Sequence, residues 1–322
     1  MKALVTGATG FLGRHLVRRL MREHEITHIV GTSRSAKNYI GDIPLDDPFG
    51  YREVCCDVTN ENEVAQLMLL YKPDIVFHMA ANPIVKEDRA RPTEISRTNI
   101  LATHILLAYA QPLSRFVFAS SATVYGNDAF DWAHEAMPAN PNAVYGATKA
   151  ASEALVNAYH HLGRVSGLSL RYVANVGEGA THGVVKDIIA KLKGDNPYLE
   201  LLGDRPGSTK HYVHVSDTVE ATVLLGLTPG LSGAVNVAND DQLNIEELAQ
   251  VIMDTLGIHK PLKWLGEGAN WKGDNRVVRV DNSLAKRWGW RPLFPRSADA
   301  VAHAVCEIDG LGSGKYNIFN KV

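Results

Sequence analysis

Three glycines, at positions 7, 10 and 13, constrain the fold of this chain more than any other feature of its sequence. They follow an apolar stretch at residues 3–6 and open an amphipathic stretch at residues 11–21. Glycine lets the backbone turn tightly and approach a phosphate closely, and a helix N-terminus offers free N–H groups to an anion. A strand, a glycine turn and a helix in this order predict a dinucleotide site at Gly7, Gly10, Phe11, Leu12 and Gly13. The alternative is a turn that serves packing alone.

Strand and helix patterns alternate through the first half of the chain. Short apolar runs that predict strands lie at residues 26–31, 52–56, 74–78, 115–119 and 168–171, and helical patterns lie at residues 61–71, 96–110 and 145–162. Such alternation is typical of a parallel sheet with helices on both faces. We therefore predict an α/β fold built on a doubly wound parallel sheet.

The composition changes after residue 172. Residues 194–207 are rich in Gly, Pro and Asp, which predicts loops around short strands, and Asn244 is a suitable N-cap for a helix that ends at Gly257. We predict a cofactor-binding domain at residues 1–172 and a smaller C-terminal α/β lobe at residues 173–322 that binds substrate. The chain is expected to return to the first domain within residues 212–240.

Tyr145 and Lys149 carry the chemistry in our interpretation. Residues four apart share one helix face, so the lysine can lower the pKa of the phenol and prepare it for proton transfer. Ser121 follows the strand predicted at residues 115–119, at the sheet edge where open α/β folds bind ligands, and can hold the same substrate oxygen. The three residues predict hydride transfer between a nicotinamide and a carbon that bears oxygen.

The second predicted strand bears on the choice of nicotinamide nucleotide. NAD sites place an acid at its end, whereas this chain has Ser33 and Arg34 there. Arg34 can pair with a 2′-phosphate, so NADP is favoured slightly over NAD. After the third and fourth strands, five further residues are expected beside the dinucleotide: Asp57, Val58, Met79, Ala80 and Ala81.

The whole-chain composition narrows the classes of protein. The formal net charge of -2 has no basic block behind it, and no apolar run reaches the length of a membrane span, so neither nucleic acid nor a membrane is expected as a partner. Three cysteines do not form a disulfide framework, and a cytoplasmic location is the default. Among thirteen histidines, the pair His211 and His214 lacks a carboxylate at ligand spacing, so no metal site is predicted.

Together these residues resemble the extended short-chain dehydrogenase/reductase family, and within it the nucleotide-sugar epimerase/dehydratase group. The resemblance rests on the glycine turn, on Asp57-Val58, on residues 78–81, on residues 120–126 and on residues 145–149, with a C-terminal signature at residues 272–274 and 286–292. It implies a Rossmann domain. It further implies that Asn99 contacts the cofactor, that Lys149 grips the nicotinamide ribose, and that Ser121, Thr123 and Tyr145 bind the sugar.

The resemblance is closest to sugar 4-epimerases, and two departures from the group pattern concern the substrate. At residues 122–123 the chain has Ala and Thr where 4,6-dehydratases carry an acid and base, which argues against dehydration. Asn175 stands one residue later than the group's phosphate-contacting asparagine, and Lys210 replaces its arginine. The expected substrate contacts are therefore Asn175, Lys210 and Lys272, with the specificity loops at residues 179–193 and 199–212.

We predict a 4-epimerase of nucleotide-diphosphate sugars, with a UDP-hexose as the expected partner. The alternatives are an NADPH-dependent reductase of a 4-keto-6-deoxy nucleotide sugar, which Arg34 favours, and a non-catalytic nucleotide-sensing protein. A homodimer is expected through the helices predicted at residues 96–110 and 145–162. The apolar residues that predict it on the first helix are Ile100, Leu101, Ile105, Leu106 and Ala108.

Overall fold

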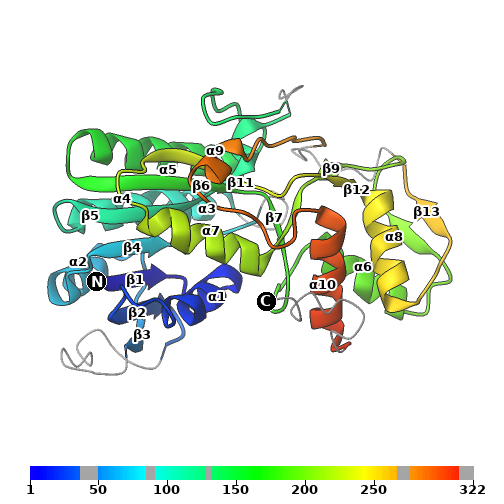
Figure 1. Cartoon of the computed structure of the whole chain (residues 1–322), viewed down its shortest axis with the longest axis horizontal. Coiled ribbons are helices and arrows are strands. Elements are labelled where there is room, and N and C mark those ends of the chain that lie inside the picture. Colours follow the sequence, from blue (N-terminus) through cyan, green and yellow to red (C-terminus); the bar gives the residue numbers. More distant parts are fainter. Residues whose placement is uncertain (37–49, 85–90, 128–131, 267–275, 312–322) are drawn as a thin grey trace.

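A seven-stranded parallel sheet forms the centre of the first lobe (Figure 1). The computed structural model describes residues 1–36, 50–84, 91–127, 132–266 and 276–311. The strand order is β11-β6-β5-β4-β1-β2-β3, so the chain runs outward from β1 to β3 and then returns to build the other half from β4. The strands are β1 (Lys2–Thr6), β2 (His28–Ser33), β3 (Tyr51–Cys55), β4 (Ile75–His78), β5 (Ser114–Ser121), β6 (Val165–Tyr172) and β11 (Gly233–Val237). The predicted doubly wound fold is confirmed.

Helices cover both faces of this sheet because its inner strands are apolar on both sides. One face packs against α1 (Phe11–Leu20) and α7 (Val215–Leu227), and the other packs against α2 (Glu61–Tyr71), α4 (Ala102–Tyr109) and α5 (Val144–His161). Two buried residues show the division: Phe77 of β4 faces the first layer, and Phe116 of β5 faces the second. Ligands of such sheets bind where the strand order reverses, which here is between β1 and β4.

The C-terminal lobe lies beside the carboxyl ends of the strands, at the right of Figure 1. Its core joins α6 (Val184–Lys193), α8 (Ile245–Leu256) and α10 (Ser297–Asp309). Short strand pairs complete it. They are β7 (Ala174–Val176) with β10 (Tyr212–His214), β8 (Leu199–Leu201) with β13 (Leu262–Trp264), and β9 (Thr209–Lys210) with β12 (Leu243–Asn244). The chain leaves this lobe at α7 and β11 and returns to the main sheet, where β11 pairs with β6.

Local sequence signals and the observed elements agree well in most places. Asn244 caps α8 with a full capping box, and Gly257 ends that helix at φ 68°. Two expectations are wrong. Residues 184–193 form helix α6 instead of a loop, and the helix expected from residue 96 begins earlier, with α3 (Pro92–Ser96) and a π-helical turn (Arg97–Leu101) before α4. The domain boundary at residue 172 stays a prediction.

A helix that spans a bilayer must be long and predominantly apolar, and the helices of the described ranges do not meet both conditions.

Candidate active site

The glycine turn between β1 and α1 is as tight as the sequence requires. Gly7 has φ +67°, and a Cβ there would lie 2.9 Å from the backbone of Ala80. A Cβ on Gly13 would lie 2.1 Å from the Gly7 carbonyl oxygen. Within the described residues no side chain caps the N-terminus of α1, and its first turn contains no acid. The N–H groups of Phe11 and Leu12 therefore belong to an uncapped helix end that attracts anions.

The end of β4 lies against this turn and is held by buried polar groups. The Ala80 N–H donates to Thr6 Oγ1 at 3.1 Å. Met79, Ala80 and Ala81 are partly buried beside the glycines. His78 bridges Thr6 Oγ1 at 2.7 Å and Thr103 Oγ1 at 3.0 Å. Burial, helped by the charge of Lys149, lowers the pKa of His78 to about 3, so this ring is neutral. It is a structural support for the turn.

Asn99, expected beside the cofactor, is buried and braces the segment that follows β4. Its Oδ1 accepts from the Asn82 N–H at 2.8 Å, and its Nδ2 donates to the Asn82 carbonyl and to Thr148 Oγ1. It therefore joins this segment to α5. The π-helical turn at residues 97–101 turns Asn99 into the interior, a type of bulge that is frequent at functional sites.

The ends of β2 and β3 carry the residues expected near the adenosine. Arg34 is exposed, and the Ser33 hydroxyl donates to the carboxylate of Glu53 at 3.0 Å. Asp57 follows β3 and accepts both the N–H and the hydroxyl of Thr59, so it forms a turn before α2. Val58 is buried beneath it. Sequence reasoning missed Glu53, because its carboxylate reaches the end of β2 only when β3 lies alongside.

Ser121 and Tyr145 come together, as predicted. Ser121 is the last residue of β5, and its Oγ accepts from Thr123 Oγ1 at 3.0 Å and caps the 3-10 helix at Ala122–Tyr125. Tyr145 lies in the first turn of α5 and shares a hydrogen bond with Ser121. Gly146 makes this possible, because a Cβ there would lie 2.6 Å from the Thr123 carbonyl oxygen. Strand β5 and helix α5 thus deliver the hydroxyls to one place.

The structure does not show the expected effect of Lys149 on the phenol. Burial raises the pKa of Tyr145 to about 12, although the hydrogen bond with Ser121 acts in the opposite direction. Burial lowers the pKa of Lys149 to about 7, against the nearby Glu153 carboxylate. The lysine Nζ donates to the Ala119 carbonyl at 2.7 Å and lies 5.7 Å from the centre of the Tyr145 ring. The desolvation of two buried groups outweighs their mutual effect.

A buried ion pair under the site was missed in the sequence. Glu153, one turn after Lys149, pairs with Arg171 of β6 at 2.7 Å and accepts from Ser120 Oγ at 2.5 Å. Arg171 also donates to the Tyr125 hydroxyl, which in turn donates to Asn236. The i, i+4 spacing of Lys149 and Glu153 was the available signal. This network fixes α5 on the sheet and so positions Lys149 and Tyr145.

Not all of the residues expected to bind substrate lie together in the structure. The Asn175 side chain donates to the Val173 carbonyl at 3.3 Å and accepts from the Thr218 hydroxyl, so its amide is engaged with the residue before β7 and with α7. Lys210 lies partly buried on β9, which pairs with β12. Lys272 lies outside the described residues. The structure therefore brings Ser121, Thr123 and Tyr145 together and gives Asn175 another set of partners.

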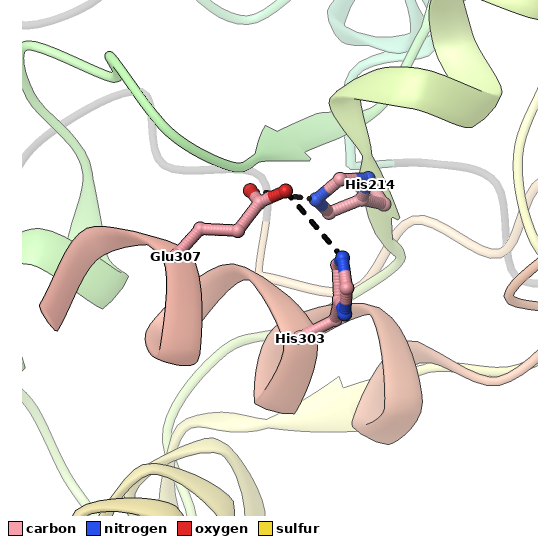
Figure 2. A group of neighbouring side chains, drawn as sticks. All are labelled: His214, His303 and Glu307. Atoms are coloured by element: carbon pink, nitrogen blue, oxygen red, sulfur yellow. Dashed lines mark hydrogen bonds and ion pairs between the residues drawn. The ribbon is translucent and has the colours of Figure 1, made fainter. Parts of the chain in front are cut away.

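A second polar cluster, which the sequence interpretation also missed, joins β10 to α10 (Figure 2). His214 Nε2 lies 3.0 Å and His303 Nε2 lies 3.4 Å from the two carboxylate oxygens of Glu307. The backbone N–H of Ser216 donates to His214 Nδ1, so the ring proton lies on Nε2 and is donated to Glu307. That nitrogen has no lone pair left for a metal, and the cluster is a hydrogen-bonded clasp between two elements.

The residues at the β1–β4 reversal fit a dinucleotide. The glycines have no Cβ atoms, so the backbone is accessible there, and small residues follow β4. Together with the uncapped N-terminus of α1, these features leave room for a pyrophosphate. Neighbouring elements at the same edge of the sheet contribute Ser121, Tyr145 and Lys149. The arrangement can hold an extended dinucleotide and present a phenol and a hydroxyl to an alcohol or ketone.

Comparison with known proteins gives a consistent result. The model of the NAD dependent epimerase/dehydratase family matches residues 3–238. The UDP-glucose 4-epimerase of Mycolicibacterium smegmatis is 30% identical over 327 residues, which covers 95% of this chain and 97% of the relative.

Solved structures agree over the same length. A UDP-galactose 4-epimerase is 29% identical with a TM-score of 0.78, over 95% of this chain and 97% of the other. DesIV, a dTDP-glucose 4,6-dehydratase from Streptomyces venezuelae solved with NAD bound, is 25% identical with a TM-score of 0.82, over 98% of this chain and 99% of the other.

Proposed function

The chain belongs to the NAD dependent epimerase/dehydratase family, and on that premise we propose that it is a 4-epimerase of nucleotide-diphosphate sugars. The observation that carries the proposal is the meeting of Ser121 and Tyr145 at the end of β5, beside Thr123 and above Lys149. Relatives named as UDP-glucose and UDP-galactose 4-epimerases support it.

The proposed chemistry is a transient oxidation at C4 of the sugar. Tyr145, in its phenolate form, accepts the proton of the 4-hydroxyl, and Ser121 donates a hydrogen bond to the same oxygen. A bound nicotinamide would supply the acceptor for the C4 hydride and would later return that hydride. The ketosugar turns over between the two steps, so hydride returns to its other face while Tyr145 returns the proton. Atoms and electrons balance, because substrate and product are isomers.

Residues next to the catalytic pair favour epimerisation over loss of water. A 4,6-dehydratase needs an acid and a base there, whereas Ala122 is buried and Thr123 donates its hydroxyl to Ser121. Neither side chain can exchange protons with a carbon of the sugar at neutral pH. The reductase stays the second candidate, because the same Ser121, Tyr145 and Lys149 would serve it and Arg34 is compatible with NADPH.

Further parts of the proposal concern ligands and assembly. A UDP-hexose is the proposed substrate, with Lys210 and Lys272 near its diphosphate and Asn175 as a less suited contact, since its amide is already bonded. We also propose a homodimer through α4 and α5. The cytoplasmic location expected from the composition stays a prediction.

Cofactor exchange separates epimerase from reductase. An epimerase keeps its reduced cofactor through the ketone stage, so the purified protein should retain nucleotide and convert UDP-glucose to UDP-galactose without added reductant. Chromatography of the sugars and of the nucleotide released on denaturation measures both. A protein that purifies empty and consumes NADPH in proportion to a 4-keto sugar nucleotide would instead be the reductase.

A further inference from the structure

The carboxyl end of β2 is where dinucleotide-binding folds of this kind recognise the adenosine ribose. A carboxylate there accepts the ribose hydroxyls of NAD, whereas NADP needs room and positive charge for its 2′-phosphate. In this chain β2 ends at Ser33, followed by the exposed Arg34. Judged from β2 alone, the position contains no acid.

Strand β3 supplies the acid that β2 lacks, Glu53. The register pairs Gly31 with Glu53 and Ser33 with Cys55, so the Glu53 side chain starts two residues before the end of β2 and reaches along it. Its Oε1 accepts from Ser33 Oγ at 3.0 Å. Its Oε2 accepts from the Tyr51 hydroxyl at 3.5 Å, and burial with the charge of Glu53 raises the pKa of that phenol to about 12, so it stays a donor. The partly buried carboxylate is therefore oriented at the end of β2.

Glu53 also projects from the face of the sheet on which the glycine turn lies. Register partners in a parallel sheet point to the same side, so Glu53 projects on the side of Gly31. A Cβ on Gly31 would lie 2.6 Å from the Ala8 Cβ and 2.8 Å from the Tyr51 hydroxyl. Ala8 belongs to the glycine turn, and its N–H donates to the Thr32 carbonyl at 3.1 Å. Glu53 thus lies on the side of the sheet where the phosphate-binding turn crosses β2.

We propose that Glu53 takes the place of the acid missing from β2, accepts the adenosine ribose hydroxyls, and makes the protein selective for NAD over NADP. The inference rests on the proposed function only in that both need a nicotinamide dinucleotide. A 2′-phosphate beside this carboxylate meets a like charge on a partly buried group, whereas the opposing Arg34 is exposed and its charge is screened by solvent. This reverses the preference drawn from Ser33 and Arg34 alone.

Equilibrium dialysis tests the selectivity without any turnover. The purified protein is dialysed against an equimolar mixture of NAD⁺ and NADP⁺, and the nucleotides in the protein compartment are separated by chromatography after denaturation. The wild-type protein should hold NAD in at least about tenfold excess, which corresponds to about 1.4 kcal/mol of discrimination. An equal mixture, or an excess of NADP, would overturn the proposal.

Glu53→Gln removes the charge and keeps the size of the side chain. The ratio of bound NAD to bound NADP should fall at least about fivefold in this variant, most of it through tighter NADP binding. Glu23→Gln is the matched control: it makes the same change of net charge just beyond the far end of α1, where Glu23 pairs with Arg19, and should leave the ratio unchanged. An unchanged ratio in Glu53→Gln would contradict a role for this carboxylate.

The result is independent of the epimerase assignment. If sugar nucleotides are not interconverted but NAD is bound in excess, the proposed reaction fails and the role of Glu53 stands. If sugars are interconverted and NADP is preferred, the role of Glu53 fails alone.

Discussion

The absence of a side chain at Gly146 allows helix α5 to begin directly against the Thr123 carbonyl. A methyl group would lie 2.6 Å from that oxygen, so any other residue would push the first turn of α5 outward. Tyr145 lies in that turn, and its hydrogen bond with Ser121 depends on the approach. The geometry of the proposed catalytic pair therefore depends on a residue that has no functional group.

Tyr145→Phe tests the proton step at this scale. Removing the phenolic oxygen leaves the 4-hydroxyl without its acceptor, so kcat for UDP-sugar interconversion should fall at least about a hundredfold. Ser121→Ala removes a hydrogen bond and not the base, and should cost less. Tyr71→Phe is the matched control, because the Tyr71 hydroxyl donates to the Ala3 carbonyl inside the protein and should affect stability more than turnover. Near-normal kcat in Tyr145→Phe would refute the proposed mechanism.

At the scale of elements, one carboxylate of helix α10 connects this helix with two other parts of the protein. Glu307 accepts from His214 of β10 and from the Glu178 N–H that follows β7. The same loop contacts α1, because His15 bonds the Glu178 carbonyl and Arg14 bonds that of Gly179. The clasp thus connects the C-terminal helix with α1, the helix that follows the glycine turn.

The pH dependence of this clasp follows from Glu307. Burial alone would raise its pKa, but hydrogen bonds from His214 and His303 hold the pKa of Glu307 well below its ordinary value. A carboxyl with a lowered folded-state pKa stabilises the protein above its unfolded value, about 4.3, and loses this contribution as pH falls further. Glu307→Gln should therefore lower the free energy of unfolding by about 1–3 kcal/mol at pH 7.

Chemical denaturation at several pH values measures this difference. The gap between wild type and Glu307→Gln should narrow between pH 5 and pH 3.5, while Glu246→Gln, which breaks the ion pair with the exposed Arg205, should change stability little at any pH. A gap that is constant over this range would mean that the carboxylate charge contributes nothing.

At the scale of the whole molecule, the apolar surface of α4 is smaller than its sequence indicates. Ile105 and Leu106 are buried against the sheet, so they cannot support a dimer as predicted. Leu101 remains 42% exposed, and Ala108 lies exposed two turns later on the same side. This narrower stripe beside α5 is the surface that a partner would cover.

Light scattering with a charged variant tests the proposed dimer. The wild-type protein should show the mass of a dimer at micromolar concentration, and Leu101→Glu should weaken dimerisation at least about tenfold because it buries a charge at the interface. Leu202→Glu makes the same change at an exposed leucine of the other lobe and should leave the mass unchanged. A monomeric wild type would end the proposal.

Local patterns were sufficient wherever short stretches of chain decide the structure. The glycine turn, the capping box at Asn244 and the i, i+4 pair Tyr145 and Lys149 each lie within one or two turns, and the structure contains all three. The parallel sheet with helices on both faces follows from the alternation of strand and helix patterns along the chain. Backbone sterics and the spacing of apolar residues act over short stretches of this chain. Their effects can therefore be recognised without knowledge of the tertiary contacts.

Only the tertiary structure decided which distant side chains meet and in which direction the pKa values of buried groups shift. Glu53 reaches the end of β2 because β3 lies beside it, and Glu307 meets His214 across 93 positions of sequence. The pKa of Tyr145 rises where its spacing to Lys149 predicted a fall, because burial removes water from both groups. Desolvation depends on everything packed around a group, and so the sequence by itself determined the fold class and brought forward the proposed catalytic residues, while the packed structure decided their electrostatics.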